Sequence, residues 1–298
     1  MKNLLLFANI RVNDHIRLNR LKNSINSLDG VKFYKYIINV RGNLKEITKK
    51  FLKKKLQGKN FKLSSIETKY GWKKDSIYLL KGIYEDCHIF NWVEDHLMVC
   101  SPKYFNTVIK ELFKKKEIDL LVYSWFCKNF RAPYLALDTV KKTNFFFYGL
   151  INRSSFASLK LKKFKDIDIT TLVSIFRKNF FIEILNSDKP FLLRWSHMCP
   201  FDFELTFRDN AFKEVIIAIP KKELLASIDD DKEPGYSLIS RKKYNFDISR
   251  EGTRLNERPF TLRLIKILGL KKNIRAKKFL ILFRRVYFTI RYFLVKIN

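Results

Sequence analysis

Residues 89–100 read IFNWVEDHLMVC, and this stretch decides how the rest of the chain is interpreted. An apolar run leads into two adjacent carboxylates and an imidazole, Glu94, Asp95 and His96, and a second apolar run follows directly. This order predicts a buried strand whose charged end opens into a cleft. Burying two carboxylates is costly without a positive partner, and a divalent cation with oxygen ligands is the simplest such partner. A solvated turn between two core strands is the competing explanation for the same residues.

Strand and helix patterns alternate on the N-terminal side of this stretch. Strands are predicted at residues 1–10, 31–40 and 61–68, and helices at residues 15–28, 44–56 and 75–85. Asn13 and Asp14 are suitable N-caps for the first helix. The pattern therefore predicts an α/β fold in which the acid pair follows about three β–α units.

The sequence V-E-D-H at residues 93–96, placed after these units, resembles the nucleotide-sugar half of GT-A-fold glycosyltransferases, in particular the bacterial family 2-like enzymes. In that family, a D-x-D-type motif at a strand end binds a metal that holds the diphosphate of the sugar nucleotide. The resemblance covers residues 1–125 and implies a Rossmann-type domain with a mixed central sheet. It also implies that Asp95, helped by Glu94, binds Mn²⁺ or Mg²⁺. The motif departs from D-x-D here, so Glu94 stands in for one carboxylate.

Other polar residues follow predicted strands, where α/β proteins bind their ligands. Arg11 and Asn13 follow the first strand, and Arg41 follows the second. Lys73 lies at the start of the third predicted helix, and a helix N-terminus with nearby cations suits a phosphate. We therefore expect these four residues to contact the nucleotide, whereas ordinary loop residues and a solvated charge are the alternatives.

A second cluster of chemically capable residues lies at residues 191–209, which read FLLRWSHMCPFDFELTFRD. An inverting glycosyl transfer needs a carboxylate that deprotonates the acceptor hydroxyl, and Asp202 and Glu204 are the candidates for this base. Neutral imidazole is a common metal ligand, so His197 is a candidate for the same metal as Asp95. The run S-H-x-x-P-F-D-F-E also resembles one in bacterial glycosyltransferase-like proteins. A structural loop with satisfied polar groups is the alternative.

The rest of the second half continues the mixed pattern. Further strands are predicted at residues 118–126, 144–153 and 214–220, a helix at residues 168–187, and solvated acids at Asp229 to Asp231. The predicted division of the chain is a GT-A-like domain at 1–260, with a nucleotide-sugar half (1–125) and an acceptor half (126–260), followed by an extension at 261–298.

Composition limits the kinds of protein that the chain can be. Its 298 residues include 60 Lys and Arg and 29 Asp and Glu, and the net charge of +31 favours an anionic partner. The 4 Cys form no C-x-x-C pair and fit reduced thiols in a cytoplasmic protein. The apolar run at the N-terminus is too short for a signal peptide. The sequence contains no uncharged apolar stretch of about 18 residues, so it predicts no transmembrane span.

The extension at 261–298 has its own composition, with 11 Lys and Arg and no acid. Lys277, Arg284 and Arg291 repeat every seven residues, which places them along one stripe of a helix whose remainder is largely apolar. This pattern predicts an amphipathic helix that lies on an anionic membrane surface. A C-terminal helix that packs on the domain is the alternative.

Together these features favour a metal-dependent glycosyltransferase that moves a sugar from a nucleotide-sugar donor to a glycan or lipid-linked acceptor. The expected setting is bacterial surface polysaccharide synthesis at the inner face of the cell membrane, with no specific nucleic-acid partner. A non-catalytic, basic nucleic-acid-binding protein also explains the net charge of +31, but it leaves V-E-D-H and residues 191–209 without a role.

Overall fold

The computed structural model describes residues 4–83, 86–125, 131–152, 171–187, 214–229 and 235–244, with single positions between 154 and 162 and between 282 and 294. The strands are β1 (Leu4–Arg11), β2 (Lys35–Arg41), β3 (Phe61–Ser64), β4 (His88–Asn91), β5 (His96–Met98), β6 (Leu120–Val122), β7 (Lys141–Lys142), β8 (Phe146–Asn152), β9 (Ser174–Arg177), β10 (Glu214–Pro220) and β11 (Leu225–Ser227). The helices are α1 (His15–Ser27), α2 (Lys45–Lys55), α3 (Gly71–Leu80), α4 (Pro102–Phe113), α5 (Ala132–Leu135), α7 (Lys178–Asn186) and the 3-10 turn η1 (Thr171–Val173).

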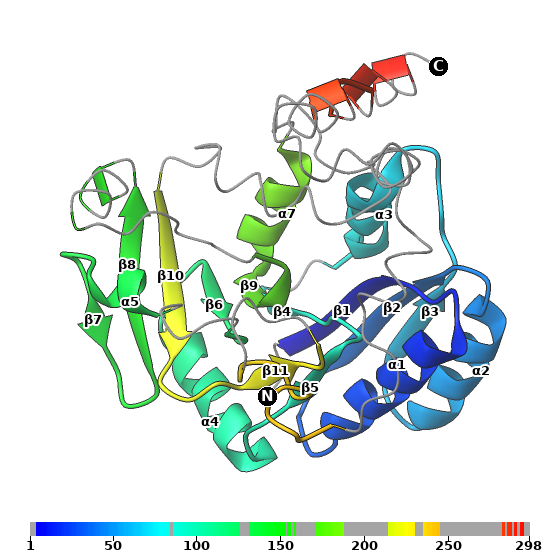
Figure 1. The fold of residues 1–298 in the computed structure, drawn as a ribbon, viewed down its shortest axis with the longest axis horizontal. Coiled ribbons are helices and arrows are strands. Elements are labelled where there is room, and N and C mark those ends of the chain that lie inside the picture. Colours follow the sequence, from blue (N-terminus) through cyan, green and yellow to red (C-terminus); the bar gives the residue numbers. More distant parts are fainter. Residues whose placement is uncertain are drawn as a thin grey trace, which may run out of the picture.

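A nine-stranded mixed sheet organises this part of the chain, in the order β3-β2-β1-β4-β9-β6-β10-β8-β7 (Figure 1). The first four strands in this order are parallel, and β9 is antiparallel to both β4 and β6. The predicted α/β fold with a mixed central sheet is therefore confirmed. Strands from both 1–125 and 126–260 share the sheet, while the predicted domain boundaries stay a prediction.

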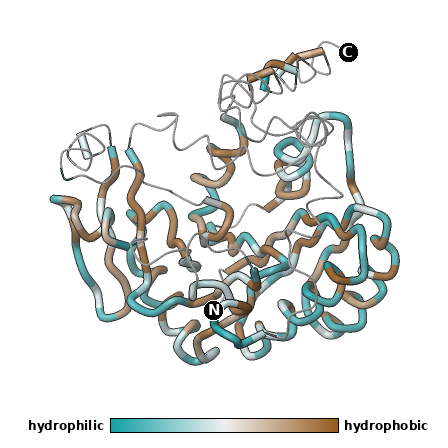
Figure 2. Tube along the Cα trace, in the orientation of Figure 1, coloured by the Kyte–Doolittle hydropathy of each residue, from teal (hydrophilic) through white to brown (hydrophobic). Residues whose placement is uncertain are grey.

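The central strands form where the sequence is almost continuously apolar. In β1, the side chains from Leu4 to Ala8 are fully buried, as expected for a parallel strand covered on both faces. Figure 2 shows hydrophobic residues gathered along these strands, with more hydrophilic residues on the outer helices. The predicted N-cap Asp14 accepts a hydrogen bond from the backbone N–H of Arg17, and α4 begins with Ser101 as N-cap and Pro102 in its first turn.

The helix predicted for residues 168–187 is wrong in its first part. Among the described residues of this range, the α-helix covers Lys178–Asn186, Thr171–Val173 form the short 3-10 turn η1, and Ser174–Arg177 form β9, which fills the gap between β4 and β6. Ile175 and Phe176 are fully buried in this strand. The apolar run before Arg177 is equally compatible with a buried strand, and pairing with two neighbouring strands decides in favour of the strand.

A small second sheet joins the apolar run after the acid pair to β11, which follows β10 in the chain. In it, β5 pairs antiparallel with β11, and the backbone N–H of Ile228 donates to the carbonyl of Asp95. Beside this sheet, Arg20 of α1 and Asp229 form an ion pair of 2.9 Å in which both side chains are at most 6% exposed. The expectation of a solvated Asp229 is therefore wrong, while residues 230 and 231 lie outside the described residues.

Most of the extension at 261–298 lies outside the described residues, but its described positions between 282 and 294 are helical. Large apolar side chains at these positions are exposed: Leu282, Phe283, Val286, Tyr287, Ile290, Phe293 and Leu294. Among the residues that the structure describes, none of the helices has the length and hydrophobicity needed to cross a membrane.

Candidate functional site

The carboxyl ends of β1 and β2 place two arginines at the same edge of the sheet. Arg11 and Arg41 are register partners, and the backbone N–H of Val12 donates to the carbonyl of Arg41 at 2.8 Å. The loops that follow the two strands pack closely together. A Cβ atom added to Gly42 would lie only 2.5 Å from Oδ1 of Asn13. Gly42 also has a φ of +94°, a conformation that glycine adopts without strain. This close approach keeps Asn13 beside the two arginines.

One carboxylate forms ion pairs with both guanidinium groups. Glu67, in the loop after β3, contacts Arg11, and its Oε1 lies 4.0 Å from Nη1 of Arg41. The Arg41 side chain is 2% exposed, whereas Arg11 and Glu67 are about one-third exposed. Among the described residues, these two positive charges therefore share one carboxylate at an accessible edge, and such an edge favours an anionic ligand.

The acid pair lies in the turn between β4 and β5, separated from the end of β4 by two residues, and β4 is next along the sheet from β1. Glu94 and Asp95 are 8% and 6% exposed, so both carboxylates are buried as the sequence predicted. Glu94 Oε1 lies 3.8 Å from Nη1 of Arg17, and Asp95 Oδ1 lies 2.8 Å from His96 Nδ1. Protein groups therefore already supply partners for both acids, and Arg17 is a partner that sequence reasoning missed. Its guanidinium also donates to the carbonyl of Arg11 at 2.8 Å, which links the arginines to the acid pair.

A tyrosine lies beneath the acid pair. Tyr123 is fully buried and donates to the carbonyl of Asn91 at 2.8 Å. Burial raises the pKa of its hydroxyl well above the ordinary value, and the negative charge of Asp95 raises it further. Tyr123 therefore stays protonated at neutral pH and supports the backbone of β4 just before the acid pair.

Two asparagines inside the apolar strands hold the loop that carries Glu67. Asn9 of β1 and Asn39 of β2 are register partners, and their amides bond at 2.9 Å. Asn39 also exchanges two hydrogen bonds of 2.7 Å with the backbone of Ile66, and Asn9 bonds Ser76 of α3. These residues were not predicted as site residues, although a lone Asn within each apolar strand was a visible signal.

A second buried carboxylate lies near the acid pair, and it too was missed. Glu223 accepts from the backbone N–H of Trp125 at 2.9 Å and forms an ion pair of 2.7 Å with Arg241. Burial raises the pKa of Glu223, and the bonds from Trp125 and Arg241 and the influence of His96 act in the opposite direction. The signal in the sequence was an acid between two lysines and the apolar run of β11.

The structure brings several predicted site residues to one edge of the sheet. Arg11, Asn13, Arg41, Glu94 and Asp95 all lie at the carboxyl edge of the sheet. Lys73, in the first turn of α3, donates to the carbonyl of Ser187 at 3.2 Å, and its neighbour Trp72 donates to the carbonyl of Asn9 in β1 at 2.8 Å. The remaining predicted residues, His197, Asp202 and Glu204, lie outside the described residues, so their roles stay predictions.

The acid pair fits a metal of the kind that the resemblance implies. Within the described ranges there is no group of three or more His, Cys, Asp or Glu residues that would form an all-protein cage. Magnesium, however, is usually held by one or two carboxylates together with substrate phosphates. The adjacent Glu94 and Asp95 supply such carboxylates, and the Nδ1 contact of His96 orients the second one.

Comparisons with known proteins give distant likenesses in fold. The chain matches no protein-family model and no curated protein sequence. Among solved structures, S. aureus TarS 1–349 is 12% identical with a TM-score of 0.47, and the match covers 76% of this chain and 60% of that chain. A UDP-glucose pyrophosphorylase complexed with UDP-glucose is 10% identical with a TM-score of 0.41, and the match covers 74% of this chain and 91% of that chain.

Two further structures hold nucleotides. TarS 1–349 in complex with UDP is 13% identical with a TM-score of 0.45, covering 75% of this chain and 59% of that chain. A UTP-bound UGPase from Acinetobacter baumannii is 10% identical with a TM-score of 0.41, covering 86% of this chain and 98% of that chain. The chain thus spans about 60% of the length of the TarS fragment that it matches. With every TM-score below 0.5, these likenesses assign no activity to this chain.

Proposed function

We propose that the chain is a glycosyltransferase that moves a sugar from a nucleotide-sugar donor to a glycan or lipid-linked acceptor. The observation that supports this most directly is the convergence of arginines and buried acids at one edge of the sheet. Arg11 and Arg41 end β1 and β2, and the acid pair Glu94–Asp95 comes after β4, the strand next to β1 and parallel to it. Ligands of α/β sheets bind beyond the carboxyl ends of such strands.

The arginines are suited to the diphosphate of the donor. Guanidinium groups bind phosphate oxygens through paired hydrogen bonds, and they keep their charge at any working pH. Before the donor binds, Glu67 holds Arg11 and Arg41, and Glu94 holds Arg17. In this proposal, the diphosphate takes the exposed side of the Arg11 guanidinium while Glu67 keeps the group in place.

A divalent ion completes the proposed donor site. Asp95, with Glu94 beside it, would hold Mn²⁺ or Mg²⁺, and the ion would neutralise charge on the leaving diphosphate. His96 fixes the Asp95 carboxylate through the 2.8 Å contact at Nδ1. In an inverting reaction, Asp202 or Glu204 would accept the proton of the acceptor hydroxyl, and His197 is proposed as a further metal ligand.

The basic extension at 261–298 is proposed to hold the enzyme at the inner, anionic face of the cell membrane. Its sequence carries 11 Lys and Arg and no acid, and its described helical positions expose large apolar side chains. A helix with these two properties lies in the membrane interface, close to a lipid-linked acceptor. Vesicle co-sedimentation with phosphatidylglycerol, comparing the full chain with a chain lacking residues 271–298, tests this part.

A panel of nucleotide sugars tests the donor site through thermal stability. A ligand that binds the folded state raises its apparent stability, so the correct donor with Mn²⁺ is expected to raise the unfolding temperature. Arg41→Ala should reduce that increase. Lys35→Ala, which removes a charge from the opposite end of β2, should not change it.

The products separate the proposal from its competitors. Release of a nucleoside diphosphate upon addition of an acceptor indicates glycosyl transfer, whereas release of pyrophosphate from a nucleoside triphosphate and a sugar phosphate indicates nucleotidyl transfer. If no nucleotide sugar raises the unfolding temperature, and nucleic acid binds with a linear log–log salt dependence, the non-catalytic alternative is correct.

A further inference from the structure

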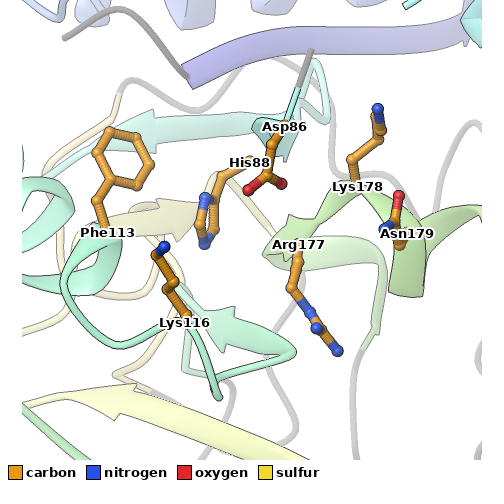
Figure 3. A pocket seen from close by; sticks show the side chains of 7 residues that line it. All are labelled: Asp86, His88, Phe113, Lys116, Arg177, Lys178 and Asn179. Atoms are coloured by element: carbon orange, nitrogen blue, oxygen red, sulfur yellow. The ribbon is translucent and has the colours of Figure 1, made fainter. Parts of the chain in front are cut away.

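A pocket lies at the other edge of the sheet, away from the acid pair (Figure 3). Its volume is about 610 Å³, and its lining comes from the start of β4, the end of α4 and the junction of β9 with α7. His88 begins β4 and is the register partner of Arg177 at the end of β9. His88 is the first residue of β4 and Glu94 lies beyond its last residue, so the length of β4 separates the pocket from the acid pair.

Positive charge predominates in this pocket. Lys116, Arg177 and Lys178 line it together with one acid, Asp86. Arg177 is held by Asp119, with Nη2 2.5 Å from Oδ1, and Lys178 donates to the carbonyl of Ile83 at 3.2 Å. These contacts fix two of the cations at the pocket wall.

The third cation is the most available to a ligand. The Lys116 side chain is exposed, and it makes no ion pair within the part of the chain that the structure describes. The first turn of α7 begins at Lys178 and adds the positive end of a helix of nine residues to the same wall.

An uncharged aromatic surface completes the wall. The ring centroids of His88 and Phe113 lie 4.8 Å apart, and Figure 3 shows both side chains among those that line the pocket. Burial lowers the pKa of His88 to about 4; the nearby Arg177 also lowers it, while Asp86 acts against the shift. The imidazole is therefore neutral at pH 7. Its Nε2 is buried and has no hydrogen-bond partner among the described residues.

We propose that this pocket binds a small phosphate-bearing molecule. Lys116, Arg177 and Lys178 would surround the phosphate, and His88 and Phe113 would line the pocket beside it. A volume of about 610 Å³ is in the usual range for small-molecule sites. A phosphate fits better than a single carboxylate because it presents several charged oxygens to cations that come from three different elements. This site does not depend on the proposed glycosyl transfer.

Calorimetric titration with inorganic pyrophosphate, in buffer with a metal chelator, tests the proposal. The chelator removes binding that depends on a metal at the acid pair. Wild-type protein is expected to bind pyrophosphate, and Lys116→Glu is expected to weaken binding about tenfold or more. Lys110→Glu makes the same charge change on an exposed position of α4 and should leave the affinity unchanged. Arg17→Ala, at the carboxyl edge, should also leave it unchanged.

A second measurement needs no variant of the pocket cations. The ring C2 proton of His88, one of 4 histidines in the chain, should shift in the NMR spectrum during the titration. His88→Phe assigns that signal. The proposal is overturned if wild-type protein binds no pyrophosphate, if Lys116→Glu and Lys110→Glu bind equally well, or if only Arg17→Ala loses binding. An unchanged His88 signal at saturation would overturn it as well.

Discussion

The two ends of β4 both carry charged groups, but these groups are organised differently. Beyond the carboxyl end, Glu94 is paired with Arg17, and Asp95 with His96. At the amino end, Lys116, Arg177 and Lys178 share a pocket with Asp86, and Lys116 makes no ion pair with any described residue. The first end has a prepared network of opposite charges, whereas the second has an excess of one sign.

This difference shows why the number of charged residues in a segment is a poor guide to its role. The net charge of +31 suggested an anionic partner but did not say where it binds. Pairing makes that distinction, because a paired charge stabilises a local arrangement while an unpaired cation attracts an anion. The following variants test whether the two ends differ in this way, in decreasing order of expected effect.

Breaking a buried charge pair near the carboxyl end should cost the most stability. Asp229→Ala leaves Arg20 buried without the carboxylate that lies 2.9 Å away. The expected loss in the free energy of unfolding is about 3–5 kcal/mol, measured by urea denaturation. Asp29→Ala breaks an exposed pair of similar length, the 2.8 Å contact with Lys55, and should cost less than about 1 kcal/mol. Equal losses in the two variants would contradict a structural role for the buried pair.

Removing the charge of Asp95 should affect catalysis more than stability. Asp95→Asn preserves an acceptor for the ring nitrogen of His96, so the fold is expected to persist. Loss of the metal-binding charge should lower the transfer rate by about a hundredfold or more, which corresponds to about 3 kcal/mol. Glu111→Gln, in a surface pair with Lys114, is the control and should transfer at the wild-type rate. Wild-type turnover by Asp95→Asn would show that the acid pair is only structural.

His88, at the amino end of β4, should make the free energy of unfolding depend on pH. The pKa of His88 is about 4 in the folded chain and about 6.5 in the unfolded chain, so the unfolded chain binds more protons between these values. The contribution of His88 to the stability of the folded state is therefore present above pH 6.5 and is lost as the pH falls toward 4. From pH 7 to pH 5, the contribution of this group should fall by about 2 kcal/mol.

Replacing the imidazole isolates this contribution. Between pH 7 and pH 5, the free energy of unfolding of His88→Phe should fall by about 2 kcal/mol less than that of the wild type, as measured by urea denaturation at each pH. His15→Phe, at an exposed position, should behave like the wild type. The same pH dependence in the wild type and His88→Phe would show that His88 is not responsible.

Helix caps should give the smallest effects, but they separate the two ends most cleanly. Asp14 caps α1, which carries Arg17, and Ser101 caps α4, which leads to the pocket. Replacing either cap with Ala should lower the free energy of unfolding by about 1 kcal/mol. Only Asp14→Ala should also weaken binding of the nucleotide-sugar donor, because the first turn of α1 holds Arg17 beside Glu94. Equal donor affinity in both variants would count against a role for Arg17.

The sequence predicts much of the N-terminal half, because alternating β and α patterns place strand ends at one edge. That rule is enough to bring Arg11, Arg41 and the acid pair together. It does not predict Arg17 or Glu67 as partners, because those contacts depend on how a helix is rotated and where a loop folds back. The ion pair of Arg20 with Asp229 joins positions 209 residues apart and has no local signal.

The amino-end pocket is invisible in the sequence for a similar reason. Its cations come from the end of α4 and the junction of β9 with α7. The single helix predicted at 168–187 contains no such junction between a strand and a helix. Residues 172–176, which are apolar except for Ser174, fit both helical and strand patterns locally. Only the presence of β4 and β6 on either side determines the strand.

The position of β9 also has a consequence for how the protein is made. β4 and β6 do not pair with each other, and β9, which joins them, is synthesised more than fifty residues after β6 ends. Until residue 177 leaves the ribosome, the nascent chain carries a four-stranded sheet whose β4 edge is open. Open strand edges pair readily with other chains, and long-range pairing folds slowly. A fragment that ends at residue 125 should therefore aggregate more readily than the full chain.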